Sequence, residues 1–340
     1  MTDIDAGELA KRRPYDWAPL LLVPLLALAA LPLIGSLSTW ATLTAAGLAM
    51  GMIIFIIASG LTLVFGLMDV LNFGHGAFIS VGAYVAAILL APLSGLLQAD
   101  SLVLNGVALL ALIALAMTAT GLLGWAFERI IIMPVYGQHL KQILVTVGGM
   151  IVAQQLIIVL WGPVQLAFPL PSAFRGAIVI GDVAIERYRV IAVVVGLLVF
   201  AGMLLVLNRT KIGLLIRAGV ENRAMVTALG IDVRRAFTLV FAIGGVAAAV
   251  AGVLSNVYFG TIDPQRGTSL LIFAFIVVVI GGLGSIGGSA VSAMVVALTQ
   301  QYTNYYASSG IGDMVVVLLL GVVLLARPRG FAGAAVGARA

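Results

Sequence analysis

Long stretches without a charged residue dominate the chain, and they predict membrane-spanning helices. A helix needs about 20 apolar residues to cross the ~30 Å hydrocarbon core of a bilayer. Stretches of roughly that length or longer occupy residues 17–68, 74–99, 101–127, 142–174, 190–208, 236–262 and 267–312, and a shorter one occupies 314–326. The pattern therefore indicates an all-α, polytopic transmembrane bundle rather than a sheet.

Two of these stretches are too long for one span. We predict that residues 17–68 form two helices divided near Ser36–Ser38, and that residues 267–312 form two helices or half-helices around a glycine-rich break. Residues 142–174 should hold one span and a proline-rich exit, and the last span should begin near Ile311. The total is about ten spans, or eight or nine if a segment is re-entrant.

The positive charges indicate an orientation. With ten spans and a cytoplasmic N-terminus, all but four of the 18 Lys and Arg residues fall on the cytoplasmic side; the exceptions are Arg175, Arg187, Arg189 and Arg266. Cytoplasmic loops of membrane proteins carry such an excess. We therefore expect a cytoplasmic tail over residues 1–17, one transmembrane domain over residues 18–330 and a cytoplasmic C-terminal tail over residues 331–340.

Composition excludes most other classes of protein. Hydrophobic residues make up 62% of the chain and charged residues only 9%, whereas about 25% charged is ordinary for a soluble domain. Lipid must therefore surround most of the surface, and the net charge of +5 reflects cytoplasmic loops rather than nucleic-acid binding. There is no cysteine, and the two histidines lie in separate segments, so we expect no metal site and no catalytic constellation.

Residues 66–78 carry polar groups between two apolar stretches. Asp69, Asn72 and His75 stand among glycines that loosen a helix. Polar groups at membrane depth usually face a partner or a water-filled path, and interrupted helices recur near transporter binding sites. Two interpretations stay open, namely a part of the translocation path or an interfacial turn in which Asn72 and His75 cap the next helix.

Residues 208–235 contain six Lys or Arg and form a sharp change from the lipid-like sequence around them. Residues 218–229 have the pattern of a short amphipathic helix that Gly230 would end. Such a helix could dock a soluble motor, or it could anchor the loop on lipid head groups. Composition by itself favours the lipid anchor.

Glycines have two roles in the predictions. The stretch Gly281–Gly288 should break a helix; it is not a phosphate-binding P-loop, because none of the three lysines follows a glycine. Gly47 with Gly51, and Gly244 with Ala248 and Gly252, place small residues on one helix face and predict close helix packing. Glu128 and Arg129 should pair at the end of a span.

Three sets of motifs, in this order, resemble the permeases of branched-chain amino-acid ABC importers, the LivH-like family. The first set lies in the N-terminal half and comprises Ala58–Gly66, Asn72-Phe73-Gly74-His75-Gly76 and Gly82-Ala83-Tyr84. The second lies in the basic segment and comprises Arg217-Ala218, Glu221 and Ala228–Ile231. The third lies near the C-terminus and comprises Gly281–Gly288 and Arg327–Gly330. The resemblance extends from about residue 43 to residue 332.

The resemblance implies an ABC importer permease fold and assigns roles to residues. The ATPase-coupling residues would be Arg217, Ala218, Glu221, Ala228, Gly230 and Ile231. The translocation path or gate would include Asn72, Phe73, His75 and Gly76, with Asp69 as a weaker candidate, and the helix break would include Gly281, Gly282, Gly284, Gly287 and Gly288.

The resemblance also implies partners. We expect two ABC ATPase subunits, a second LivM-like permease and a periplasmic substrate-binding protein, in a bacterial cytoplasmic (inner) membrane. The chain itself would be no enzyme and hold no cofactor, because ATP would be bound and hydrolysed by the partner. The cargo would be branched-chain amino acids or a related small polar solute; urea, amides and aromatic acids stay open, as does a homodimer or heterodimer of permeases.

Two rival classes remain. An ion-coupled secondary transporter or channel would need a charged site at mid-membrane, but Asp69, Asp263 and Asp313 lie at or near predicted span ends. A membrane-embedded enzyme would need a nucleophile with a base, or a metal, and the sequence offers neither.

Overall fold

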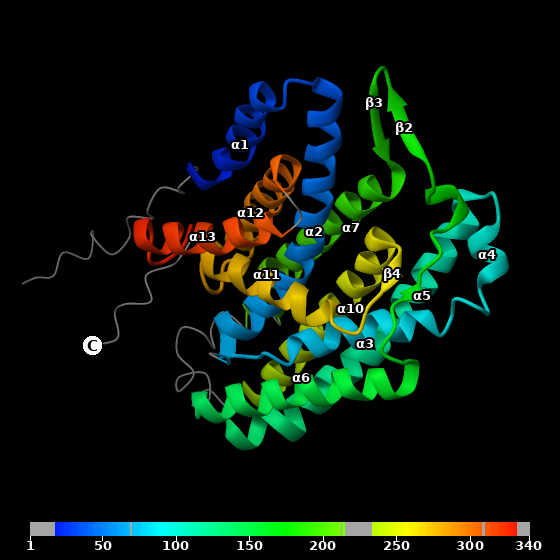
Figure 1. Ribbon diagram of the computed structural model, residues 1–340. Coiled ribbons are helices and arrows are strands. Elements are labelled where there is room, and N and C mark those ends of the chain that lie inside the picture. The colour runs from blue at the N-terminus through cyan, green and yellow to red at the C-terminus, as the bar shows by residue number, and fades with distance from the viewer. Residues whose placement is uncertain (1–17, 69, 212, 215–232, 308–309, 332–340) are drawn as a thin grey trace, which may run out of the picture.

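A computed structural model of the chain describes residues 18–68, 70–211, 213–214, 233–307 and 310–331, and it consists almost entirely of helices (Figure 1). The helices of the first half are α1 (Ala18–Ile34), α2 (Leu37–Met68), α3 (His75–Ala87), α4 (Ser94–Gln98), α5 (Leu102–Phe127), the π-helix η1 (Glu128–Ile132), the 3-10 helix η2 (Met133–Val135) and α6 (His139–Trp161). Those of the second half are η3 (Ser172–Phe174), α7 (Arg187–Arg209), α10 (Val233–Phe259), α11 (Arg266–Gly281), α12 (Ile286–Tyr306) and α13 (Ile311–Ala326). The predicted all-α, polytopic class is confirmed.

Most predicted span boundaries agree with the helices. The first long stretch divides at Gly35 and Ser36, and α13 begins at Ile311. Among the described residues, α2, α5, α6, α7 and α10 are long and apolar enough to cross a membrane, while α1, α3, α11 and α13 are shorter apolar helices. Figure 1 shows the hairpin of strands β2 (Ala177–Ile180) and β3 (Val183–Glu186), together with α4, on the right-hand side, and the C-terminal end of α13 on the left.

The predicted span over residues 74–99 is wrong in its extent. Helix α3 ends at Ala87, and the chain continues through tight turns to α4. In these turns the amides of Ile88, Leu89 and Leu90 donate to carbonyls three residues earlier. Pro92, which has no amide hydrogen to donate to a preceding turn, stands within these turns, and the apolar stretch is not one continuous helix.

The part of the chain that the structure describes has two small strand pairs that the helical pattern did not predict. Strands β2 (Ala177–Ile180) and β3 (Val183–Glu186) form an antiparallel hairpin, in which Gly181 has the positive φ of 60° that a two-residue turn requires. Strands β1 (Leu166–Ala167) and β4 (Thr261–Ile262) also pair antiparallel, with Leu166 opposite Ile262. The β1–β4 pair connects the segment after α6 to the segment after α10.

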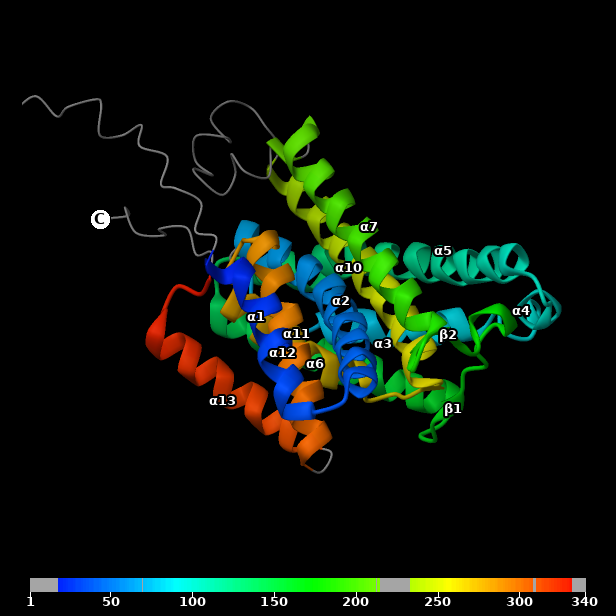
Figure 2. The same cartoon turned by 90° about the horizontal axis from the view of Figure 1, so that it is seen from above.

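Helix α2 occupies the centre of the bundle (Figure 2). Of its apolar stretch 89% is buried, against 72% for α10 and 11% for α6. Small residues allow this packing: Gly51 of α2 lies against the backbone of Ala293 and Met294 in α12, and Gly252 of α10 lies against the backbone of α3 at Ile79. The predicted packing faces are therefore confirmed at these positions.

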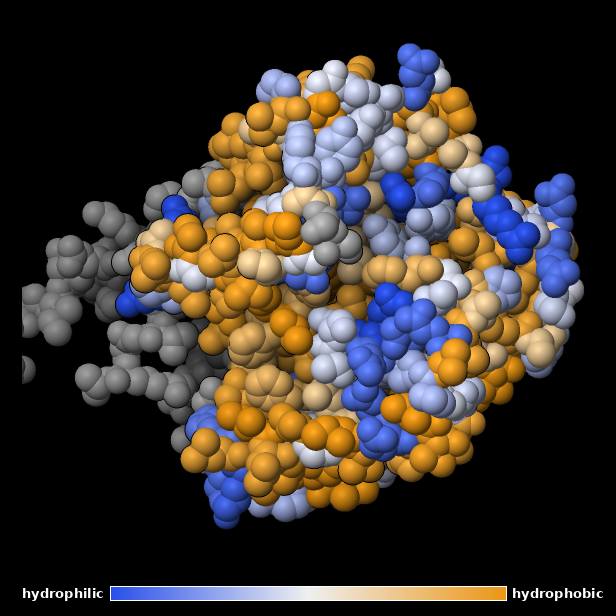
Figure 3. Space-filling model, viewed as in Figure 1, coloured by the Kyte–Doolittle hydropathy of each residue, from blue (hydrophilic) through white to orange (hydrophobic). Residues whose placement is uncertain are grey.

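The surface follows the membrane pattern. In Figure 3 hydrophobic side chains cover most of the visible face, and hydrophilic ones gather toward the right-hand side, where Figure 1 has α4 and the strands. Exposed apolar residues line the outer helices, for example Leu160 of α6 and Leu198 of α7. This surface suits lipid or another membrane subunit as its neighbour.

Candidate functional site

Side chains of Tyr136 and of α6 hold the loop between α2 and α3, in addition to the hydrogen bonds that α3 makes with it. The Tyr136 hydroxyl, just after η2, donates a hydrogen bond to the Met68 carbonyl at 2.9 Å. The Thr146 hydroxyl of α6 lies 3.4 Å from the Leu71 carbonyl oxygen and accepts a bond from the Phe73 amide at 3.3 Å. The described part of this loop is thus anchored from two neighbouring elements.

Asn72 lies in this loop, and its side chain is 2% exposed. Neither its amide nitrogen nor its amide oxygen has a hydrogen-bond partner among the described residues. A buried polar group without a partner costs about 1–3 kcal/mol. The interpretation of Asn72 and His75 as helix caps is wrong, because the cap of α3 is Gly74, with no side-chain capping bond. Asn72 is therefore a destabilising residue here, which makes it the strongest candidate for a functional role.

His75 is completely buried between α2 and α10. Its Nε2 atom lies 3.2 Å from the Ile57 carbonyl oxygen of α2, and its Nδ1 atom has no partner among the described residues. The ring is seated against two glycines: a Cβ on Gly60 would lie 3.1 Å from His75 Cε1, and one on Gly244 would lie 3.7 Å away. In this conformation His75 joins helices and lines no open path, and its part in transport stays a prediction.

Phe73 and Gly76 connect the same loop to α11. The Phe73 ring stacks on Phe275 at 6.0 Å between centroids, and Phe275 also meets the edge of Phe65 from α2 at 5.9 Å. Gly76 faces Gly267 of α11, where a Cβ on Gly267 would come within 2.2 Å of the Gly76 carbonyl oxygen. A movement of α11 would therefore act directly on the start of α3.

The glycine stretch breaks the helix as the sequence indicates: α11 ends at Gly281 and α12 begins at Ile286. Gly282 and Gly284 have φ values of 96° and 83°, which side chains rarely adopt. Gly281 and Gly288 face each other so closely that a Cβ on Gly288 would lie 2.0 Å from the Gly281 carbonyl oxygen. Gly287 is half-buried in the first turn of α12.

Two further segments meet at this break. Gly284 meets Gly66 near the end of α2, because a Cβ on Gly66 would lie 2.3 Å from the Gly284 Cα atom. After α13 the Phe331 amide donates to the Ile280 carbonyl at 2.8 Å, which returns the chain to α11. The break is thus a point of contact for α2, α11, α12 and the segment after α13.

Comparison with known proteins identifies the family of this chain. A family model described as "Branched-chain amino acid transport system / permease component" matches residues 43–326. The chain belongs to this family. It is a membrane permease subunit of the ABC importer class, and the resemblance seen in its motifs is confirmed.

Several permeases of known systems are similar over most of the chain. The high-affinity branched-chain amino acid permease LivH of Escherichia coli (strain K12) is 30% identical over 84% of this chain and 93% of its own. BraD of Pseudomonas aeruginosa is 32% identical over 84% of this chain and 94% of its own. The probable LivH of Methanocaldococcus jannaschii is 25% identical over 83% and 89%. No solved structure matches this permease.

The predicted pair of Glu128 and Arg129 in this permease is wrong. Glu128 in η1 is 3% exposed, and its carboxylate accepts a hydrogen bond from the Thr238 hydroxyl of α10 at 2.7 Å, whereas Arg129 is exposed. Neighbouring residues of a helix point in different directions and do not face each other. Glu128 therefore connects η1 to α10.

The end of the permease that carries the β2–β3 hairpin also has a cluster of aromatic and arginine residues, which the motifs did not reveal. Arg189 pairs with Glu186 and donates to the Thr42 carbonyl at 3.2 Å, and Tyr188 packs edge-on against Tyr258 at 5.8 Å. The Arg266 guanidinium lies 3.9 Å from the centroid of the Phe259 ring. Arginines next to aromatic residues near span ends were the available signal for this cluster.

Some predicted residues lie outside the described part of the permease. These are Asp69 of the proposed path and all six proposed coupling residues, Arg217, Ala218, Glu221, Ala228, Gly230 and Ile231. Their roles stay predictions. The described residues contain no group of three or more His, Cys, Asp or Glu side chains that could hold a metal ion.

Proposed function

We propose that this permease imports branched-chain amino acids, or a related small polar solute, with energy from ATP. The family supports the permease role, and the similar permeases LivH of Escherichia coli and BraD of Pseudomonas aeruginosa, both of branched-chain amino acid systems, support the substrate class. Two ATPase subunits hydrolyse ATP, since this sequence carries no P-loop, and a second LivM-like permease completes the path. A periplasmic binding protein delivers the solute, and the complex lies in a bacterial inner membrane.

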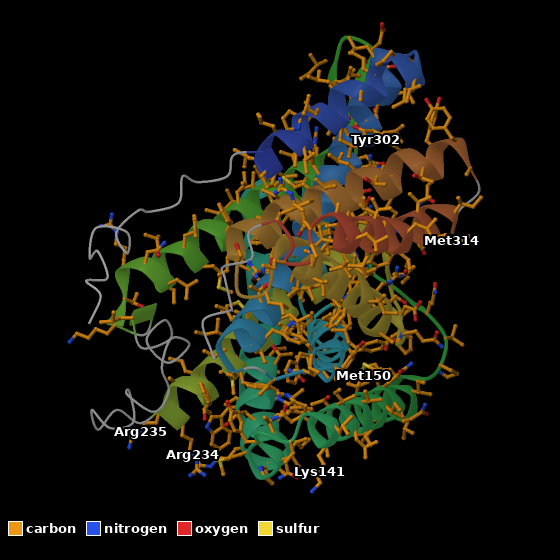
Figure 4. All side chains as sticks on the ribbon, turned by 90° about the vertical axis from the view of Figure 1, so that its left-hand side faces the viewer. Lys141, Met150, Arg234, Arg235, Tyr302 and Met314 are labelled. Carbon is orange, nitrogen blue, oxygen red and sulfur yellow. The ribbon has the colours of Figure 1, made fainter. Side chains whose placement is uncertain are left out.

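The distribution of charge supports an orientation with α4 and the β2–β3 hairpin outside. Arg187, Arg189 and Arg266 stand at helix ends on the hairpin side, and Arg209, Arg234 and Arg327 stand at the opposite ends of α7, α10 and α13. Figure 4 has the left-hand side of Figure 1 toward the viewer, and Lys141 and Arg235 are labelled in it. The Lys/Arg excess at the end opposite the hairpin supports a cytoplasmic assignment of that end.

Reconstituted transport tests the energy source. We expect liposomes that hold this permease with its partner permease and ATPases to accumulate labelled leucine only with ATP inside and binding protein outside. A non-hydrolysable ATP analogue should abolish uptake. Uptake that continues with the analogue and collapses with an ion gradient would identify a secondary transporter, although Asp263 and Asp313 both lie outside the helix centres.

The docking of the ATPases is proposed on residues 217–231, between α7 and α10 in the sequence. We expect the substitutions Arg217→Glu and Glu221→Arg, introduced singly, to reduce the ATPase recovered with the tagged permease by about tenfold, as interfacial charge reversal commonly costs more than 1.4 kcal/mol. Arg175→Glu, on the hairpin side, is the control. Undiminished recovery and uptake in both variants would refute docking at this segment.

A further inference from the structure

Tyr136 makes contact in two directions at the proposed cytoplasmic end of the bundle. Its ring stacks on Phe237 of α10, with 5.6 Å between centroids and 26° between planes. Its hydroxyl donates to the Met68 carbonyl, at the end of α2. The side chain thus reaches from α10 to the start of the loop that contains Asn72 and Phe73.

A second contact keeps this segment beside α10. The buried Glu128 carboxylate of η1 accepts a hydrogen bond from Thr238, the residue after Phe237. The chain between Glu128 and Tyr136 passes through one π-helical and one 3-10 turn, and such turns often occur at functional sites and hinges. Two neighbouring residues of α10 therefore hold η1 and Tyr136 in place.

The position of Phe237 would allow these contacts to transmit a movement of α10. It lies in the first turns of α10, which begins at Val233 and follows in the sequence the segment proposed to dock the ATPases. A displacement of this end of α10 would move the aromatic stack, and the rigid tyrosine ring would carry the movement to the Met68 carbonyl.

The loop that receives this movement has a reason to change conformation. Asn72 is buried with two unpartnered polar atoms, so an arrangement that gives its amide hydrogen-bond partners would be stabilised. Coupling between distant sites requires an element with two arrangements that both sites bias. We take the α2–α3 loop as this element, because the unpartnered Asn72 amide favours a second arrangement, and Tyr136 contacts the end of α2 at which the loop begins.

We propose that Tyr136 is a positioning residue that transmits movement of α10 to the α2–α3 loop, and so couples ATP hydrolysis to opening of the path. This inference rests on the proposed function. It assigns Tyr136 no contact with the solute. Its loss should therefore separate hydrolysis from import rather than abolish both.

The test measures solute imported per ATP hydrolysed in the complete reconstituted transporter. Tyr136→Phe keeps the ring stack and removes the hydrogen bond to Met68, while Phe237→Leu keeps the bond and removes the stack. We expect each substitution to lower this ratio at least about threefold, with hydrolysis within about twofold of the wild type, as the loss of one hydrogen bond or ring contact allows. If both contacts serve the same path, the double variant should import no less solute per ATP than the more impaired of the two single variants.

Tyr305→Phe is the matched control, because Tyr305 of α12 is 45% exposed and should leave the ratio unchanged. Hydrolysis and import that fall together in Tyr136→Phe would show a merely structural role and overturn the inference, as would an unchanged ratio. A wild-type transporter that imports leucine without ATP would refute the proposed function itself, and the inference with it. A wild type that couples normally beside an unaffected Tyr136→Phe variant refutes only the inference.

Discussion

Replacing Gly288 with alanine is expected to abolish uptake and to reduce the folded permease recovered from membranes. The new Cβ would lie 2.0 Å from the Gly281 carbonyl oxygen and 3.0 Å from the Ser285 hydroxyl. Because the nearest atom belongs to backbone, no side-chain rotation can relieve the clash. Overpacking of this kind costs about 1–3 kcal/mol and sometimes more, and here it would separate α11 from α12.

Size-exclusion chromatography of a fluorescently tagged permease, with its thermal midpoint, measures the effect. Gly321→Ala is the matched control, because Gly321 also lies within a helix, and a Cβ there meets no atom within 4 Å. Alanine stabilises a helix interior by about 1 kcal/mol relative to glycine, so the control should be equal to the wild type or more stable. A normal yield and midpoint for Gly288→Ala would contradict the close contact at the helix break.

Replacing Asn72 with leucine is expected to separate stability from transport. Leucine has a similar size but no polar atom, so it removes two buried groups without partners, each of which costs about 1–3 kcal/mol. The thermal midpoint should stay the same or rise. Uptake should fall at least about tenfold if the amide gains its partners during transport, since each 1.4 kcal/mol lost from a required state is a factor of ten.

Leucine uptake into reconstituted liposomes, beside the thermal midpoint, checks both halves of this expectation. Asn105→Leu is an instructive contrast. Asn105 of α5 is also buried, but its amide donates to the carbonyls of Leu96 and Ala99, and its oxygen accepts from the Ala173 amide. That variant should lose stability. A stable Asn72→Leu permease with full uptake would remove Asn72 from the translocation path.

Aromatic contacts and hydrogen bonds were the least visible features in the sequence. Tyr136 stands among ordinary interfacial residues, and nothing in its spacing indicates that it contacts Met68, which lies 68 positions earlier. Glu128 has an arginine beside it, yet its partner is Thr238, 110 positions later. Such pairs depend on which helices pack together, and the periodicity of a single helix does not contain that information.

Apolar stretches and glycines by themselves determined the class of protein, the division at Ser36–Ser38, the start of α13 at Ile311 and the break after Gly281. This is because the bilayer core demands apolar, internally hydrogen-bonded segments of a fixed length, and glycine alone tolerates the backbone of that break. Only the tertiary structure decided that His75 joins α2 to α10, that α3 ends at Ala87 and that Asn72 is buried without a partner. Those outcomes depend on packing between segments far apart in the chain, where neighbouring backbones and side chains settle which polar atoms find partners.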